Sequence, residues 1–227
     1  MTRVDILAEQ ARYYRERAPE YDDWWFRRGR YDLGPEENAR WVAQTAEVEQ
    51  ALDRFRPSGD VLELACGTGI WTRHLVRRAA RVTAVDASPE MIELNRARLG
   101  DAPVDYVQAD LFAWRPQTAY DVCFFSFWLS HVPESRFNGF WRLVDAALRL
   151  EGRVFLVDSN RGESAHTEPG EGADRELRRL SDGREFEIVK RYYEPAALER
   201  RLAALGWRFE LSVTAAGGLV YGFGRRA

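Results

Sequence analysis

Acidic residues and glycines in the first half of the chain are spaced as in a ligand-binding site. Glu63 precedes Gly67 and Gly69, and Asp86 follows them at roughly the 20-residue offset of a ribose-binding acid. Glycines tolerate positive φ angles and let a ligand approach the backbone, and a carboxylate accepts hydrogen bonds from sugar hydroxyls. The pattern therefore indicates a nucleoside-type ligand with a charged tail.

The elements around these residues alternate between strands and helices. Apolar segments predict a sheet, with strands at 60–64, 81–86, 104–110, 120–126 and 153–158. The segment 120–126 is continuously apolar, as expected of a buried parallel strand. In α/β sheets the carboxyl ends of the strands line the ligand crevice, so the residues that end these strands are expected to meet there.

Further elements flank this core. Helices are expected over about 4–17, 36–55, 136–150, 175–180 and 194–206. A strand is expected over 186–193. Two alternating segments at 207–213 and 219–224 predict a terminal antiparallel hairpin.

The motif Glu63-x-Ala65-x-Gly67-x-Gly69 resembles the first motif of class I S-adenosylmethionine-dependent methyltransferases. The family more often has glycine where Ala65 stands, and alanine costs little there unless its φ is positive. A dinucleotide fingerprint wants glycine or alanine where this chain has Thr72. The resemblance implies a Rossmann-like α/β fold, with a mostly parallel seven-stranded sheet, a C-terminal antiparallel hairpin and an N-terminal helical lid.

The resemblance also implies how S-adenosylmethionine would be held. Asp86 would bind the ribose, and Asp110 would accept a hydrogen bond from the adenine amino group. The backbone N–H of Leu111 would face a ring nitrogen, and Ala87 and Met91 would touch the purine. The full set of expected cofactor-binding residues is Tyr14, Tyr21, Glu63, Ala65, Cys66, Gly67, Gly69, Asp86, Ala87, Met91, Asp110, Leu111, Phe125 and Ser126.

The acceptor site is expected between an aromatic N-terminal segment and a loop after the fourth strand. Tyr14, Ala18, Tyr21 and Asp22 resemble a segment that caps the cofactor in related small-molecule methyltransferases. His131 matches a Leu-x-His-Val segment of the family, which makes it the candidate catalytic residue, as a base or as an acceptor contact; a lone loop histidine can also be structural. Expected substrate-binding residues are Trp25, Trp128, His131, Tyr192 and Tyr193.

The segment that follows the fourth strand, Ser126-Phe-Trp-Leu-Ser130, narrows the acceptor class. It is not the Asn/Asp-Pro-Pro-Tyr or Phe motif of base-methylating members, and the chain lacks the paired-glutamate loop of protein arginine methyltransferases. We therefore expect a small apolar or aromatic acceptor, with O-methylation favoured over N-, S- or C-methylation. The alternatives are a nicotinamide-dependent oxidoreductase, which the absence of a Tyr-x-x-x-Lys pair disfavours, and a non-catalytic nucleoside-binding or interaction module.

Length and composition set the remaining expectations. The 227 residues make one domain, divided into a lid and first helix at 1–56 and a core at 57–227 with a pocket insertion at about 159–193. A net charge of -3 gives no bulk attraction to nucleic acid or anionic membrane, and no apolar run predicts a membrane span. Cys66 and Cys123 lack ligand-like spacing, so we expect no metal and a cytoplasmic location. The sequence does not specify an oligomeric state and is compatible with a homodimer.

Overall fold

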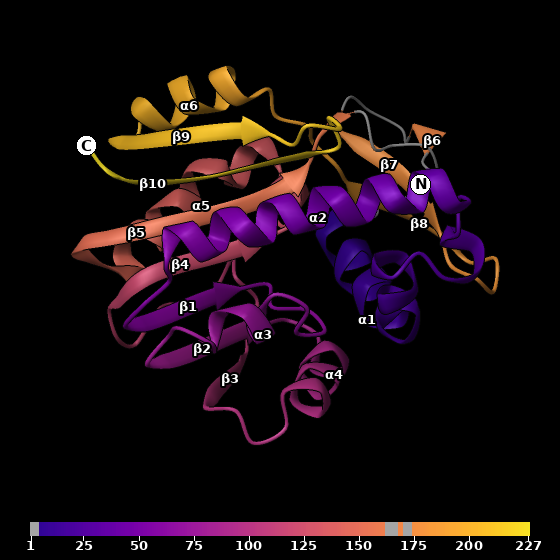
Figure 1. Cartoon of the computed structure of the whole chain (residues 1–227), viewed down its shortest axis with the longest axis horizontal. Coiled ribbons are helices and arrows are strands. Elements are labelled where there is room, and N and C mark those ends of the chain that lie inside the picture. Colours follow the sequence, from indigo (N-terminus) through magenta and orange to yellow (C-terminus); the bar gives the residue numbers. More distant parts are fainter. Residues whose placement is uncertain (1–4, 162–167, 170–173) are drawn as a thin grey trace.

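The computed structural model describes residues 5–161, 168–169 and 174–227, so part of the predicted pocket insertion lies outside the described residues. Its main sheet has the strand order β3-β2-β1-β4-β5-β10-β9 (Figure 1). The strands are β1 (Asp60–Leu64), β2 (Arg81–Asp86), β3 (Val104–Gln108), β4 (Tyr120–Ser126), β5 (Leu148–Ser159), β9 (Trp207–Val213) and β10 (Leu219–Arg226). Neighbouring strands from β3 to β5 are parallel, and β10 is antiparallel to both β5 and β9. The predicted mostly parallel sheet with its terminal hairpin is confirmed.

Helices cover both faces of this sheet. α2 (Pro35–Phe55) and α3 (Thr72–Leu75) pack on one face, and α5 (Glu134–Ala147) and α6 (Pro195–Ala203) pack on the other (Figure 1). α4 (Pro89–Leu99) joins β2 to β3; it starts where the Ser88 hydroxyl accepts the N–H of Met91. Among the helices of the described segments, none has the length and apolar character needed to cross a membrane.

The N-terminal helix α1 (Ile6–Trp25) packs against a second, smaller sheet rather than the main one. This sheet consists of β6 (Glu168–Pro169), β7 (Arg175–Arg179) and β8 (Glu185–Val189), all antiparallel. Tyr13 of α1 forms a small apolar cluster with Leu180, Phe186 and Ile188. Two short helical turns adjoin this region: η1 (Gly29–Tyr31) follows α1 along the chain, and η2 (Leu129–His131) contacts β8.

The helix predicted over 175–180 is wrong, because this segment is strand β7. Its residues have good helix propensity, but β7 pairs with β8, and α1 packs against β8. Arg179 lies directly opposite Glu185 and forms an ion pair with it. Cross-strand pairing and burial therefore override the local preference.

Tryptophans at the end of α1 and in its neighbours form part of the core. The ring centroid of Trp25 lies 5.3 Å from that of Trp41 and 5.6 Å from that of Trp71, in edge-on contacts. The indole N–H of Trp41 donates to the carbonyl oxygen of Trp25 at 2.7 Å. Trp25 is buried, so its predicted role as a substrate-binding residue is replaced by a packing role.

Candidate active site

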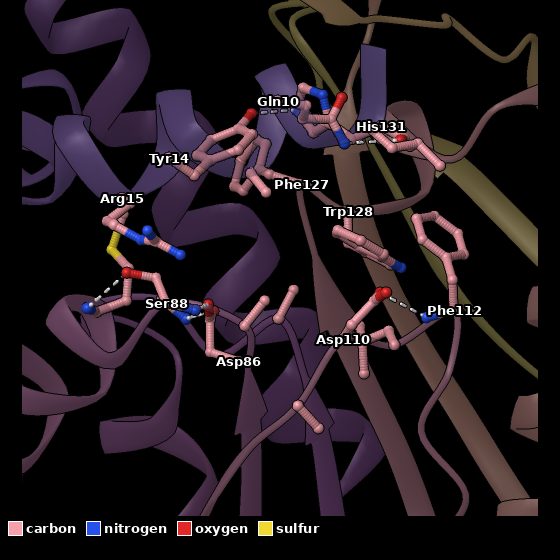
Figure 2. Close-up of a pocket in the computed structure, with 18 of the residues that line it drawn as sticks. Gln10, Tyr14, Arg15, Asp86, Ser88, Asp110, Phe112, Phe127, Trp128 and His131 are labelled. Carbon is pink, nitrogen blue, oxygen red and sulfur yellow. Dashed lines mark hydrogen bonds between the residues drawn. The ribbon is translucent and has the colours of Figure 1, made fainter. Parts of the chain in front are cut away.

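A cleft of about 680 Å³ lies at the carboxyl ends of the parallel strands. The strand order reverses between β1 and β4, and such a reversal opens a crevice in parallel sheets. Figure 2 shows Asp86 and Asp110 on the strand side of this pocket, with Tyr14 and His131 opposite them. The expected cofactor-binding residues that line the cleft are Tyr14, Tyr21, Ala65, Gly67, Asp86, Ala87, Met91, Asp110, Leu111 and Ser126.

Asp86 joins the glycine turn to the start of α4. Its Oδ2 accepts the N–H of Gly67 and its Oδ1 accepts the N–H of Ser88, both at 2.9 Å. Burial raises the pKa of Asp86, while these two hydrogen bonds oppose the rise. Each oxygen of an ionised carboxylate keeps a second lone pair, so Asp86 can still accept two hydroxyl donors.

The turn after β1 holds three residues with positive φ, namely Ala65, Gly67 and Gly69. Gly67 has φ 52°, and a Cβ there would meet no atom within 4 Å because it would project into open space. Ala65 has φ 54°. A non-glycine residue in this region costs about 1–2 kcal/mol, so the departure from the family motif is a strained one.

Asp110 and Leu111 form the far end of the cleft. Asp110 is exposed, and its Oδ1 accepts the N–H of Phe112 at 2.9 Å. Leu111 is buried beside it. A carboxylate and an apolar wall at one place suit the amino edge and the face of a purine.

Glu63 does not line the cleft, contrary to the prediction. Its side chain is 1% exposed, and its Oε2 accepts a hydrogen bond from the Thr72 hydroxyl at 2.6 Å. Burial raises the pKa of Glu63 to about 8, so the carboxyl group is largely protonated at neutral pH. Glu63 therefore supports the turn from beneath.

Three further expected cofactor-binding residues also lie outside the cleft lining. A Cβ at Gly69 would sit 2.5 Å from Oδ1 of Asn95, so glycine is required there for α4 to pack closely. Cys66 and Phe125 are buried in the two main apolar clusters. These residues shape the site through packing and not through a surface that a ligand can reach.

The lid predicted from the aromatic segment corresponds to α1, which covers one side of the cleft. The hydroxyl of Tyr14 lies 2.7 Å from Nε2 of His131, and Nδ1 of His131 lies 2.7 Å from the carbonyl oxygen of Val189. Since a carbonyl only accepts, Nδ1 carries the proton and Nε2 accepts from Tyr14 (Figure 2). Burial and the nearby Lys190 hold the pKa of His131 well below 6.5, so the ring is neutral.

A second, smaller cavity of about 60 Å³ lies behind the cleft. Its lining residues are Tyr14, Arg17, Tyr21, Trp24, Phe127, His131, Ser159, Arg178, Lys190 and Tyr192. Tyr14, Tyr21, Phe127 and His131 line both cavities, so they form a partition between them. Phe127 has φ 49°, a strained backbone conformation of the kind that clusters at functional sites.

Three cations surround this second cavity. Arg178 pairs with Glu176 at 2.7 Å, and Nζ of Lys190 lies 3.6 Å from Oδ1 of Asp158. Lys190 also donates to the hydroxyls of Ser130 and Ser159, at 3.0 and 3.2 Å. Both of these cations are thus compensated by a carboxylate.

Arg17 is the third cation, and it differs from the other two. It is 7% exposed and lies over the rings of Tyr13, Tyr21, Trp24 and Tyr31, at 5.0–6.0 Å from their centroids. Its Nε is buried without a hydrogen-bond partner, and no carboxylate of the described segments forms an ion pair with it. Arginine keeps its charge in any protein environment, so this site holds one uncompensated positive charge.

Two of the expected substrate-binding aromatics, Trp128 and Tyr192, line a cavity. Trp128 lines the cleft, and its ring centroid lies 5.6 Å from that of Phe112. Its indole N–H is buried without a hydrogen-bond partner. Tyr192 lines the second cavity, where its hydroxyl donates to Glu176 at 2.7 Å. Tyr193 instead packs on Phe137 and lines neither cavity, so its prediction is corrected.

Sequence patterns missed the residues that give the second cavity its charge. Arg17 stands among exposed charged residues of a helix, and Arg178 stands in a segment predicted as a helix. Gln10 was also missed: its side chain donates to the carbonyl oxygen of His131 and accepts from the N–H of Val189, both at 3.1 Å. No spacing rule links these three positions.

Comparison with known proteins identifies the family. Residues 61–152 match a family described as a methyltransferase domain. The ubiquinone biosynthesis O-methyltransferase of Xanthomonas axonopodis pv. citri is 30% identical over 169 residues, which cover 72% of this chain and 69% of that protein. The chain belongs to the class I S-adenosylmethionine-dependent methyltransferases. Malonyl-[acyl-carrier protein] O-methyltransferase 1 of Ilyobacter polytropus is 29% identical, but the match spans only 38% of its length.

Two solved structures resemble this chain over nearly all of its residues. The complex of DhpI with SAH has a TM-score of 0.80 and 38% identity, and covers 100% of this chain and 99% of DhpI. The complex of DhpI with SAM and HEP has a TM-score of 0.79 and 39% identity, and covers 99% of this chain and 100% of DhpI. Family membership decides against the nicotinamide-dependent oxidoreductase and the non-catalytic module.

The methyltransferase uses S-adenosylmethionine, and its cleft fits this cofactor. The open space over Gly67 lets a ligand approach the backbone, and Asp86 has lone pairs left for the ribose hydroxyls. Asp110 and Leu111 would hold the adenine. When bound, the cofactor supplies a methyl group that its sulfonium activates toward nucleophiles. The protein's own part is to hold the reactants, align them and exclude water.

Proposed function

We propose that this methyltransferase transfers a methyl group to an oxygen of a small acceptor that carries an oxyanion. The acceptor's oxyanion would pair with the cations of the second cavity through one oxygen and present another oxygen to the cleft at the partition of Tyr14, Tyr21, Phe127 and His131. Small carboxylates, phosphate monoesters and phosphonates share this chemistry. This proposal replaces the small apolar or aromatic acceptor expected from the sequence.

The uncompensated charge of Arg17 carries this proposal. A buried cation without a counterion is costly in a low-dielectric interior, and an anionic ligand removes that cost. Of the three cations at the cavity, Arg178 and Lys190 already have carboxylate partners. One negative charge brought by the acceptor therefore balances the site.

The protonation states around the cavity agree with an acceptor that arrives ionised. An oxyanion needs no proton removed before it reacts, so no general base is required. Nε2 of His131 already accepts a hydrogen bond from Tyr14, whose own pKa burial raises well above 10. The histidine thus orients the tyrosine hydroxyl at the partition, and the pair need not take up a proton during turnover.

The apolar part of the lining limits the size and character of the acceptor. Trp128 and Phe112 present aromatic surface to the cleft, and the indole N–H of Trp128 has no partner. An acceptor with a short apolar body and one hydrogen-bond acceptor would satisfy these groups. The Xanthomonas and Ilyobacter relatives are both named O-methyltransferases, which supports oxygen as the methylated atom.

The proposal is tested by methyl transfer from labelled S-adenosylmethionine to matched pairs of acceptors. Each pair contains a small oxyanion and its neutral counterpart, such as a carboxylic acid with its amide, or a phosphonate with its dialkyl ester. Simple phenols and alcohols complete the panel. We expect label transfer to oxyanions only. Carboxylate products should release labelled methanol on mild alkaline hydrolysis, whereas phosphonate and phosphate products, which resist this hydrolysis as anionic methyl esters, should be identified by their mass. Equal transfer to phenols or to the neutral counterparts would overturn the oxyanion proposal.

A further inference from the structure

Helix α1 closes both cavities at once. From its two sides it contributes Gln10, Tyr14 and Tyr21 to the cleft, and Tyr14, Arg17 and Trp24 to the second cavity. The cofactor site and the acceptor site therefore share one wall. Whatever stabilises α1 in this position completes both sites together.

Hydrogen bonds and an ion pair hold α1 at each end. Near its start, Gln10 bonds to the backbone of His131 and Val189. Near its end, Asp22 accepts the hydroxyl hydrogen of Thr68 at 2.7 Å and forms an ion pair with Arg98 of α4. Thr68 lies between the two glycines of the cofactor turn, so this contact joins α1 directly to the cofactor site.

The unpaired charge of Arg17 destabilises the closed position that these contacts stabilise. It lies between the two anchored ends of α1, and closing the helix removes its guanidinium from water without providing a carboxylate. The surrounding rings offer cation–π attraction, which compensates only part of the lost hydration. The closed position of α1 is therefore less stable without an anion than with one.

We propose that the acceptor's negative charge pairs with Arg17 and so holds α1 closed over the cofactor, with the result that acceptor and cofactor increase each other's affinity. Arg17 is then both the residue that selects a charged acceptor and the residue that links the two sites. The inference rests on the proposed oxyanion acceptor. Because binding linkage is reciprocal, the effect can be measured from the cofactor side alone.

The test measures the affinity of the full chain for S-adenosylhomocysteine by calorimetry. Inorganic phosphate serves as the oxyanion probe, and sodium chloride at equal ionic strength serves as its control. We expect phosphate to lower the dissociation constant of S-adenosylhomocysteine by about 5- to 20-fold, within the usual range of coupling between two sites. Hydrogen exchange of the amides in 6–25 should slow when both ligands are present.

Variants of α1 show whether Arg17 carries the coupling. Arg17→Met should abolish the phosphate effect and raise the melting temperature of the ligand-free protein by about 2–10 °C, because it replaces an unpaired buried charge with an apolar side chain. Arg12→Met is the matched control: Arg12 is exposed on the same helix, lies over Phe186 and lines neither cavity. It should keep the wild-type coupling. If Arg17→Met does not fold, Arg17→Gln gives the same comparison.

The outcomes separate this inference from the proposed function. The inference would be overturned if phosphate did not change the affinity of the wild-type protein for S-adenosylhomocysteine. It would also be overturned if the Arg17→Met variant kept the wild-type coupling. Oxyanion methylation could still occur in that case, and the acceptor panel would show it. Conversely, coupling to phosphate that depends on Arg17, together with methyl transfer to neutral acceptors only, would overturn the proposed function and the acceptor's part in the linkage. It would leave Arg17 only as a residue through which a free oxyanion raises cofactor affinity.

Discussion

Tyr14 of α1 donates a hydrogen bond to Nε2 of His131, so the lid already occupies the lone pair that the candidate catalytic histidine would need as a base. The same ring is fixed on its other side by Nδ1, which donates to the carbonyl oxygen of Val189 in β8. The neutral imidazole therefore connects α1, the loop after β4 and the second sheet. This geometry favours a positioning residue over a general base.

Replacing either partner of this hydrogen bond should have the same effect. We expect Tyr14→Phe and His131→Asn each to lower the catalytic rate by about 10- to 100-fold, because both release the partition at the site of transfer. The double variant should be no worse than either single one, since both remove one shared interaction. A base role would instead give a loss of about 10²–10⁴-fold for His131→Asn with Tyr14→Phe close to wild type. Catalytic rates of the single and double variants at saturating substrate concentrations distinguish the positioning role from the base role.

The pH dependence of activity provides an independent check on His131. Burial and Lys190 hold its pKa well below 6.5, so it stays neutral at and above that pH. We expect a pH–rate profile without a histidine step near 6.5. The unfolded chain does take up this proton below about pH 6.5, so the contribution of His131 to folding stability should be present above that pH and decrease as the pH falls. A rise in rate centred near pH 6.5 that His131→Asn removes would contradict this assignment.

Asp86→Ala should weaken cofactor binding by roughly 1.5–3 kcal/mol, or about 10- to 150-fold in the dissociation constant. The variant loses the carboxylate for the ribose hydroxyls and also the bonds that fix Gly67 and Ser88. Calorimetry with S-adenosylhomocysteine measures the effect. Asp105→Ala is the control, because Asp105 is exposed on the neighbouring strand β3. Unchanged affinity in a folded Asp86→Ala protein would remove Asp86 from the ribose site.

Ala65→Gly should stabilise the protein, although glycine usually destabilises. The φ of 54° at Ala65 costs about 1–2 kcal/mol for alanine, against about 0.5–1 kcal/mol lost through the greater freedom of glycine in the unfolded chain. We expect a net gain of about 0.5–1 kcal/mol in chemical denaturation. Ala87→Gly, at a cleft position that lacks a positive φ, should lower stability. A loss of stability in both variants would show that Ala65 is not strained.

Glu63→Gln should change how stability depends on pH. The folded-state pKa of Glu63 is about 8 against 4.5 for an ordinary glutamate, so the folded protein holds a proton that the unfolded chain releases above pH 4.5. The stability contributed by this group is present below pH 4.5 and is lost as the pH rises toward and past 8. An amide in place of the carboxyl group would keep an acceptor for Thr72 without this loss, so the variant should exceed wild type in stability at pH 9 and resemble it at pH 5. Glu93→Gln, exposed on α4, should show no such difference.

Local chemistry in the sequence was enough to predict the main sheet and half of the cofactor cleft. Gly67 and Asp86 stand at strand ends, and parallel strands bring their carboxyl ends together whatever lies elsewhere in the chain. Ser88 and Pro89 likewise fix the start of α4 through contacts within a few residues. Such features depend on short-range spacing, which a sequence displays directly.

Only the tertiary structure decided what surrounds the acceptor. Arg17 and Arg178 stand far apart in the sequence, yet they line one small cavity because α1 packs on the second sheet. Glu63 and Trp25 are expected ligand contacts in the sequence, but both are buried and contribute to packing. The positive φ of Ala65 likewise shows that alanine is strained at this position. Burial, charge pairing and φ depend on which distant segments meet, and no residue pattern along the chain specifies that. The sequence therefore determined the cofactor and its turn, and long-range packing determined the charge of the proposed acceptor site.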